Sequence, residues 1–168
     1  MHSTTLTVFV ANPEVSLIAA KLMTRNVVTT TPDTLVKDAI GLLRRHHLHD
    51  IPVIDADGKP VGMLTARAIL HHALPAYASE DLLAAMQASP DLPSVHERLH
   101  QQDERKVSEV MSPQILSVKE TASTNAIAAM LVLLRNDSQN ILVIDETGRL
   151  VGTISALDVL FRDKPDTP

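Results

Sequence analysis

The chain repeats itself, and this duplication limits its possible folds more than any other feature. Short motifs of the first half recur in the second half in the same order, 88 or 90 residues later. The pairs are Met23-Thr24 and Met111-Ser112, Val53-Ile54-Asp55 and Val143-Ile144-Asp145, Val61-Gly62 and Val151-Gly152, and Thr65 and Ser155. A copy of about 50 residues is too short to bury both faces of a three-stranded sheet. We therefore expect one pseudo-symmetric module, in which the two copies pack sheet to sheet.

Both copies predict the same order of elements: strand, helix, strand, strand, helix. The strand signals are short runs rich in β-branched residues, and the helix signals are apolar residues at a spacing of three or four. The Asp57-Gly58 pair favours a tight hairpin, and Thr31-Pro32 favours a capped helix start. For the first copy we expect a strand at 27–29, a helix from Thr31-Pro32, strands at 51–54 and 60–64, and a helix from Thr65. For the second we expect a strand at 115–118, a helix that includes Ile127, Met130, Leu133 and Leu134, strands at 141–144 and 150–154, and a helix from Ser155.

The remaining segments flank or join the copies. Asn12-Pro13-Glu14 predicts the start of a helix that carries Val15, Ile18 and Leu22 on one face, and we expect it to pack beside the first copy. Ser79-Glu80-Asp81 and Ser94-x-x-Glu97 predict helix starts between the copies. The expected boundaries are an N-terminal extension at 1–15, the first copy at 16–73, a helical linker at 74–106 and the second copy at 107–164.

Composition disfavours several classes of function. The net charge is −5 and the chain holds one tyrosine, two phenylalanines and no tryptophan, so neither a basic surface nor a stacking platform for nucleic acid is expected. The absence of cysteine excludes a disulfide framework, a thiolate metal site and a cysteine nucleophile. No apolar run approaches the roughly 20 residues that cross a membrane. We expect a cytoplasmic protein that binds neither nucleic acid nor membrane.

The combined pattern resembles a known family. Each copy resembles the CBS domain in the order of its motifs: Met-Thr/Ser, a β-branched run, a helix, Val-Ile-Asp, a glycine turn, Val-Gly-x-x-Thr/Ser and a helix. Two copies in order resemble a CBS pair, or Bateman module, over residues 16–72 and 107–162. The resemblance implies an α/β fold of two pseudo-symmetric β-α-β-β-α repeats with two sites in the cleft between them, usually for adenosine-containing ligands. It also implies dimerisation of modules and a regulatory role rather than an enzymatic one.

One candidate site lies in the second copy, in Gly152-Thr153-Ile154-Ser155-Ala156-Leu157-Asp158, which has the family's G-x-x-[T/S]-x-x-[D/N] spacing. Gly152 lets a ligand approach the backbone. Thr153 and Ser155 lie where the last helix begins and its free N–H groups favour a phosphate. Asp158, one helical turn later, can accept charge-assisted hydrogen bonds from ribose hydroxyls. The same spacing is also that of a capping box, and this alternative stays open.

The resemblance also implies the rest of the site. The facing wall comes from Asn26-Val27 and Leu48-His49, and Gln139-Asn140 lies near the phosphate. Relatives often carry basic residues at that last pair, so the neutral amides favour a nucleoside, a monophosphate or an adenosyl compound over a triphosphate. The candidate regulatory ligands are AMP, ADP, ATP and S-adenosylmethionine. The first copy has Ala68 in place of the ribose-binding acid, so its site is expected to be empty, degenerate or specific for another ligand.

Two other functions remain possible. The chain could be a ligand-free dimerisation scaffold, because the run 131–134 is apolar on more than one helix face. It could also be a histidine-based metal or pH sensor, since eight histidines are present. Adjacent histidines such as His46 and His47 point to different helix faces, and no His-Glu-x-x-His motif occurs, so we expect no metal site. No nucleophile–base–acid arrangement indicates a catalytic site. We expect a homodimer that signals to an unknown effector protein.

Overall fold

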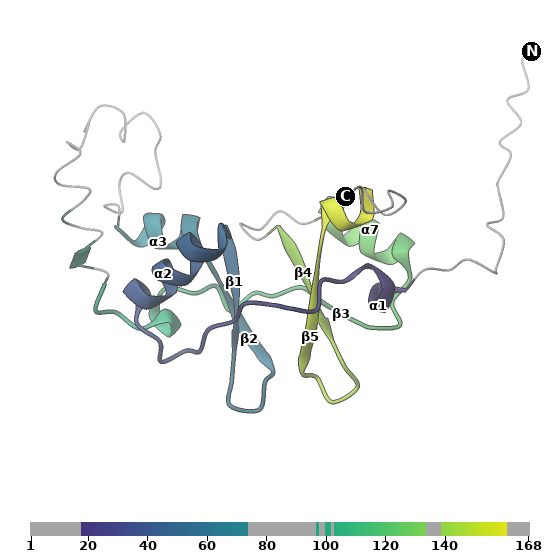
Figure 1. Ribbon diagram of the computed structural model, residues 1–168, viewed down its shortest axis with the longest axis horizontal. Helices are drawn as coiled ribbons and strands as arrows, with labels where there is room; N and C mark the ends of the chain where they lie inside the picture. The colour runs from purple at the N-terminus through teal and green to yellow at the C-terminus, as the bar shows by residue number, and fades with distance from the viewer. Residues whose placement is uncertain (1–17, 74–96, 98–99, 102, 134–138, 161–168) are drawn as a thin grey trace, which may run out of the picture.

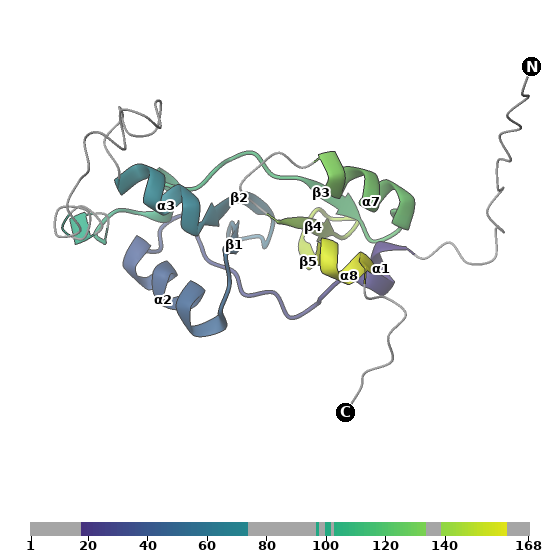
Figure 2. The ribbon, with the colours of Figure 1, turned by 90° about the horizontal axis from the view of Figure 1, so that it is seen from above.

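A computed structural model of the protein describes residues 18–73, 97, 100–101, 103–133 and 139–160. Its elements in chain order are α1 (Ala19–Leu22), α2 (Val36–His46), β1 (Asp50–Ile54), β2 (Pro60–Thr65), α3 (Ala66–Ala73), the 3-10 helix η2 (Val107–Glu109), β3 (Ser117–Lys119), α7 (Thr124–Leu133), β4 (Asn140–Ile144), β5 (Leu150–Ser155) and α8 (Ala156–Leu160). Two β-hairpins lie side by side at the centre, and the helices cover the two outer flanks (Figures 1 and 2). This mixed α/β architecture of two similar halves is the predicted one.

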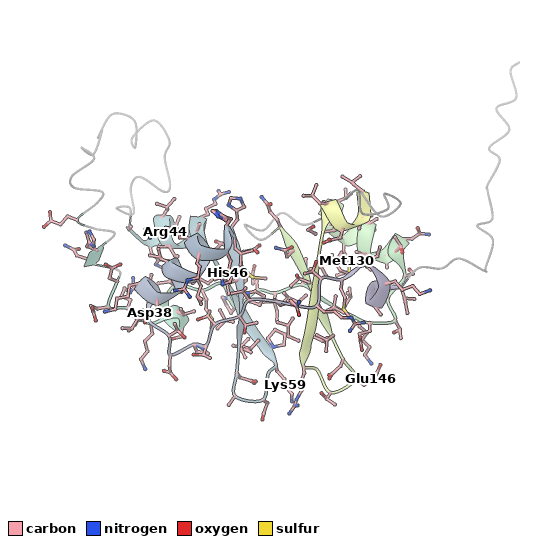
Figure 3. The ribbon with its side chains drawn as sticks, viewed as in Figure 1. Asp38, Arg44, His46, Lys59, Met130 and Glu146 are labelled. Carbon is pink, nitrogen blue, oxygen red and sulfur yellow. The ribbon has the colours of Figure 1, made fainter. Side chains whose placement is uncertain are left out.

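The two hairpins show the duplication most clearly in the structure. β1 pairs antiparallel with β2 and β4 with β5, and the equivalent partners are Val53–Gly62 and Val143–Gly152. Gly58 and Gly148 adopt φ of 81° and 83°, which a residue with a side chain rarely reaches. Both turns point to the same end of the module, where Figure 3 labels Lys59 on one and Glu146 on the other. The four predicted hairpin strands are confirmed, and each gains one residue at the end away from the turn.

The first predicted strand is reduced to a single bridge. Residues 27–29 form no strand, and Thr30 alone bridges Val53 in parallel, with its N–H donating to the Pro52 carbonyl at 3.0 Å. Its second-copy equivalent, β3, does pair in parallel with β4. The Thr30 hydroxyl is buried and has no hydrogen-bond partner among the residues that the structure describes. The strand at 27–29 was therefore predicted wrongly.

The predicted start of the first long helix is also wrong. Thr31-Pro32 lies in a turn, and α2 begins only at Val36. The reason is tertiary, because the first N–H groups of α2 are satisfied from outside the first copy. The Val36 N–H donates to the Arg105 carbonyl at 2.8 Å, and the Lys37 N–H donates to the Asp103 carbonyl at 3.3 Å. A helix can begin wherever such acceptors lie, and no local capping side chain is then needed.

The two hydrophobic cores exchange segments between the copies. The first consists of Val36, Ala39, Leu43, Ile51, Val53, Leu64, Ile69, Val107 and Val110. The second consists of Ala19, Leu22, Met23, Val118, Ile127, Ile141, Val143 and Ile154. Thus α1 packs against the second copy and η2 against the first, so the expectation that the N-terminal helix packs beside the first copy is wrong. The N–H of Ala19 donates to the Ala122 carbonyl at 2.8 Å and fixes that crossing.

Equivalent contacts in the two halves hold the exchanged segments in place. Met23 packs on Gly152 and Met111 on Gly62, and a Cβ built on either glycine would come within 2.6 Å of the methionine sulfur. Thr24 pairs with Thr153 through two backbone hydrogen bonds of 2.9 and 3.0 Å. Ser112 and Met63 make the equivalent pair of bonds, both of 2.9 Å. Each copy therefore completes its core with a segment of the other.

Three further predicted helix starts cannot be compared with the structure. The helix starts predicted at Asn12-Pro13-Glu14, at Ser79-Glu80-Asp81 and at Ser94 lie outside the described residues. Within the described ranges, no helix is both long and apolar enough to cross a membrane.

Candidate functional site

A cavity of about 240 Å³ lies between the two copies. Its walls come from the segment that precedes Thr30, from the start of β1, and from the β4–β5–α8 unit. The lining residues are Thr24, Asn26, Val27, Val28, Leu48, Asp50, Pro52, Asn140, Thr153, Ser155 and Asp158. Seven of the ten predicted site residues are thus brought together from both copies.

Ser155 and Asp158 form the capping box that the sequence allowed. The Ser155 N–H and hydroxyl both donate to Asp158 Oδ2, at 2.7 and 2.8 Å. The Asp158 N–H in turn lies 3.4 Å from Ser155 Oγ. Within the described part of the chain no hydrogen bond or ion pair reaches Asp158 Oδ1. Capping and ligand binding are therefore compatible here, because the cap occupies one carboxylate oxygen and leaves the other.

Three of the predicted residues do not line the cavity. Gly152 is buried, and its missing Cβ makes room for Met23 rather than for a ligand. His49 is exposed and lines a different cavity, beside α2 and α3. Gln139 is exposed, and its backbone N–H donates to Asp50 Oδ2 at 3.0 Å.

Asp50 is a cavity residue that the sequence analysis missed. It is 6% exposed, and its Oδ1 accepts a hydrogen bond of 2.6 Å from Asn140 Nδ2. Asp50 and Asn140 occupy equivalent positions of the two copies, 90 residues apart. That equivalence was a usable signal, because residues near a pseudo-twofold axis meet their own counterparts. Thr24, Val28 and Pro52 were also missed, although Thr24 belongs to a repeated motif.

The equivalent positions of the first copy have different chemistry. The Ala68 N–H donates to Thr65 Oγ1 at 2.9 Å, so the helix cap is kept without an acid. Met63 takes the place of Thr153 and is 3% exposed. The first copy thus offers an alanine methyl group and a thioether where the second offers a carboxylate and a hydroxyl.

Two further cavities and the histidines lie elsewhere. A cavity of about 900 Å³ borders α2 and α3 and includes His47, His49 and His100. Another of about 450 Å³ lies near the hairpin turns and includes Arg25 and Arg149. Partial burial lowers the pKa of His72, and the positive charges of Arg105 and His71 add to that effect. Among the described residues, no three His, Asp or Glu side chains are placed to hold a metal ion.

Comparisons with known proteins agree with this architecture. A CBS domain-containing protein of Dictyostelium discoideum is 30% identical to this chain over 145 residues. The match covers 86% of this chain and 89% of that protein. The inosine-5'-monophosphate dehydrogenase of Methanocaldococcus jannaschii is 23% identical over 146 residues. That match covers 87% of this chain but only 23% of the enzyme, so the similarity concerns a minor part of it.

Solved structures show the same fold. The CBS-pair protein CBSX2 of Arabidopsis thaliana superimposes with a TM-score of 0.71 at 19% identity, over 88% of this chain and 94% of that one. A structure of CBSX2 in complex with AMP gives a TM-score of 0.62 at 22% identity, with 86% of this chain and 94% of that one covered. The family model for the CBS domain matches residues 18–74 and again residues 107–164. The chain therefore belongs to the CBS domain family and is a CBS pair.

Proposed function

We propose that this CBS pair is a regulatory module that binds an adenosine-containing small molecule in the cavity between its copies. The main observation in support is that Asp158 lines the cavity and uses only its Oδ2 atom for the helix cap. Its Oδ1 can accept a charge-assisted hydrogen bond from a ribose hydroxyl. The AMP complex of CBSX2 supports the ligand class.

The opposite wall is suited to the base of such a ligand. Val27, Val28 and Pro52 offer apolar surface, while Thr24 and Asn26 add polar atoms at its edge. A mostly apolar pocket with a few polar groups is the usual form of a small-molecule site. Because one wall belongs to each copy, a bound ligand joins them and favours the arrangement in which both contact it.

The signal then passes to a partner in the cytoplasm through a homodimer. Val132, Leu157 and Leu160 are 84%, 61% and 74% exposed. They belong to α7 and α8, which pack against each other. Large apolar side chains gathered on one exposed surface are typical of an interface. A ligand that changes the arrangement of the copies would alter this surface and hence the bound effector.

A thermal-shift panel tests the proposal. The ligands are adenosine, AMP, ADP, ATP and S-adenosylmethionine, and the proteins are wild type, Asp158→Asn and a matched control, Asp145→Asn, at the hairpin turn. A ligand at 100 times its Kd adds about 2.7 kcal/mol to the free energy of unfolding. For a chain of this length that raises Tm by about 5–11 °C. Replacing the charged acceptor weakens binding about tenfold or more in Asp158→Asn only.

The remaining outcomes identify the alternatives. A flat panel at millimolar ligand, with Asp158→Asn changing only the stability without ligand, favours the dimerisation scaffold. A response to chelator or mild acid that persists in Asp158→Asn favours the histidine sensor. A ligand shift equal in all three proteins contradicts the proposed site.

A further inference from the structure

A second cavity between the copies lies at the opposite end of the hairpins, beside their two turns (Figure 1). Its volume is about 450 Å³, which falls within the range of about 300–1,000 Å³ that small-molecule sites occupy. Residues of both copies line it, and of these Val27 alone also lines the cavity that contains Asp158. The turn-end cavity is therefore separate from the proposed adenosine site.

A backbone hydrogen bond between the copies holds the walls of the turn-end cavity together. The Leu150 N–H, at the start of β5, donates to the Gly58 carbonyl of the first turn at 2.9 Å. The reverse bond cannot form, because the equivalent of Leu150 in the first copy is Pro60, which has no N–H. Only the first turn is tied to the other copy in this way. The cavity is thus shaped before a ligand binds, which reduces the entropy lost on binding.

Arg149 lies against the first turn and offers its guanidinium to this cavity. A Cβ built on Gly58 would lie 3.9 Å from Arg149 Cγ, so the side chain packs over that turn. The backbone N–H of Arg149 donates to Asp145 Oδ1 at 2.9 Å. Within the described part of the chain, no hydrogen bond or ion pair reaches the Arg149 guanidinium. A guanidinium is a planar fork of donors that matches the two oxygens of a carboxylate.

Two other charged residues line the turn-end cavity, Arg25 and Asp57. The Arg25 guanidinium already donates to the Ala20 carbonyl at 3.3 Å and lies 3.7 Å from Glu120 Oε1, so it adds charge rather than an open fork. Asp57 offsets one of the two arginines, and the lining is left with one net positive charge. This balance favours a ligand with a single negative charge.

Apolar side chains provide another part of the lining. Val27, Ile54, Leu150 and Val151 are half-buried and line the cavity from both copies. A pocket with apolar walls and a few charged groups binds an amphipathic molecule in one orientation. We infer that the turn-end cavity is a second ligand site, which binds a small organic carboxylate with its charged group on Arg149 and its apolar body against these four side chains.

An NMR titration of the full chain, followed through backbone amide signals, tests the inference with matched probes. Isovalerate carries a carboxylate on a branched apolar body, and isovaleramide has the same body without the charge. Isovalerate should shift the Gly58 and Leu150 signals and saturate them with a Kd of about 1–10 mM, as expected for so small a ligand. Isovaleramide should bind at least tenfold more weakly, because it lacks the charge-assisted hydrogen bonds.

Two variants locate the charged contact. Arg149→Gln should weaken isovalerate binding at least tenfold. The matched control is Lys59→Gln, because Lys59 occupies the equivalent position of the first copy and does not line the cavity. It removes the same charge at the neighbouring turn and should keep the affinity within about twofold, since water and salt screen an exposed charge. Both side chains are exposed, so both variants should fold.

Three results would overturn the second site. The first is equal affinity for isovalerate and isovaleramide, which would leave no role for the charge. The second is equal weakening in Arg149→Gln and Lys59→Gln, which would reduce the effect to a general positive potential. The third is the absence of saturation, or saturable shifts confined to residues far from the two turns. Because this cavity is separate from the one that contains Asp158, none of these results decides whether an adenosine compound binds there.

Discussion

At the scale of single residues, one motif both caps a helix and lines the proposed ligand site. In the second copy Ser155 caps the helix that follows and lines the cavity, with its hydroxyl 2.8 Å from Asp158 Oδ2. In the first copy Thr65 caps the corresponding helix through the Ala68 N–H at 2.9 Å. The two caps share a structural role, and only one of them is placed at the proposed ligand site. This pair of residues separates the two roles experimentally.

Ser155→Ala and Thr65→Ala should therefore lose similar stability and differ in ligand binding. Each substitution removes a helix cap, which costs about 1 kcal/mol of unfolding free energy. Only Ser155→Ala also removes a hydroxyl that donates to Asp158 Oδ2, which leaves this carboxylate held by the Ser155 N–H alone. It alone should therefore weaken binding of an adenosine compound. Denaturant unfolding and calorimetry on both variants provide the two readouts. Equal affinities in the two variants would argue against a site at Ser155.

At the scale of elements, the two ends of α2 have different determinants. Its start is set by the carbonyls of Asp103 and Arg105. Its end is set locally by His47, which adopts φ 53° and ψ 41° and whose N–H approaches the Arg44 and Leu43 carbonyls. A non-glycine residue in the left-handed region is disfavoured by about 1–2 kcal/mol. The histidine pair thus spans the helix boundary, with His46 inside and His47 outside.

Glycine at these two adjacent positions should have opposite effects. His47→Gly relieves the left-handed strain and should stabilise the protein by about 1 kcal/mol. His46→Gly places glycine in the last helical position and should destabilise it by up to about 1 kcal/mol. Thermal unfolding should resolve the difference as Tm shifts of opposite sign, each of about 2–4 °C. Two shifts of the same sign would mean that side-chain packing, rather than backbone conformation, dominates this helix end.

At the scale of the whole molecule, the exchange of segments means that each short repeat contributes residues to the core of the other. Val107 and Val110 lie at the start of the second copy, yet they complete the core of the first. Ala19, Leu22 and Met23 do the same for the second core. The exchange also forms the cavity, because Thr24 to Val28 follow directly on the segment that crosses over. The proposed ligand site and the two cores therefore depend on the same crossing.

Val107→Ala should weaken the entire module rather than one copy. Val107 is fully buried, and truncating it should cost about 2 kcal/mol of unfolding free energy. Its neighbour Ser108, exposed on the same 3-10 helix, provides the control, and Ser108→Ala should change stability by less than about 0.5 kcal/mol. Calorimetry should show one transition at a lower Tm in Val107→Ala. Two separate transitions would show that the copies unfold independently.

Much of this could be predicted from the sequence because the signals are local or repeated. The duplication fixed the number of copies, alternation and turn residues gave the hairpins around Gly58 and Gly148, and the Ser155–Asp158 spacing placed a cap and a candidate site. Seven of the ten predicted site residues do line one cavity. Each of these inferences needs only neighbouring residues or the comparison of one copy with the other.

Only the tertiary structure decided the features that join distant segments. It assigned α1 to the second core, moved the start of α2 to Val36, and used Gly152 to accommodate Met23. It also brought Asp50 against Asn140 inside the cavity. Periodicity specifies which face of an element is buried but not which partner covers it. That choice depends on shape, as at Met23 and Gly152, and on backbone acceptors supplied from far along the chain, as at Arg105.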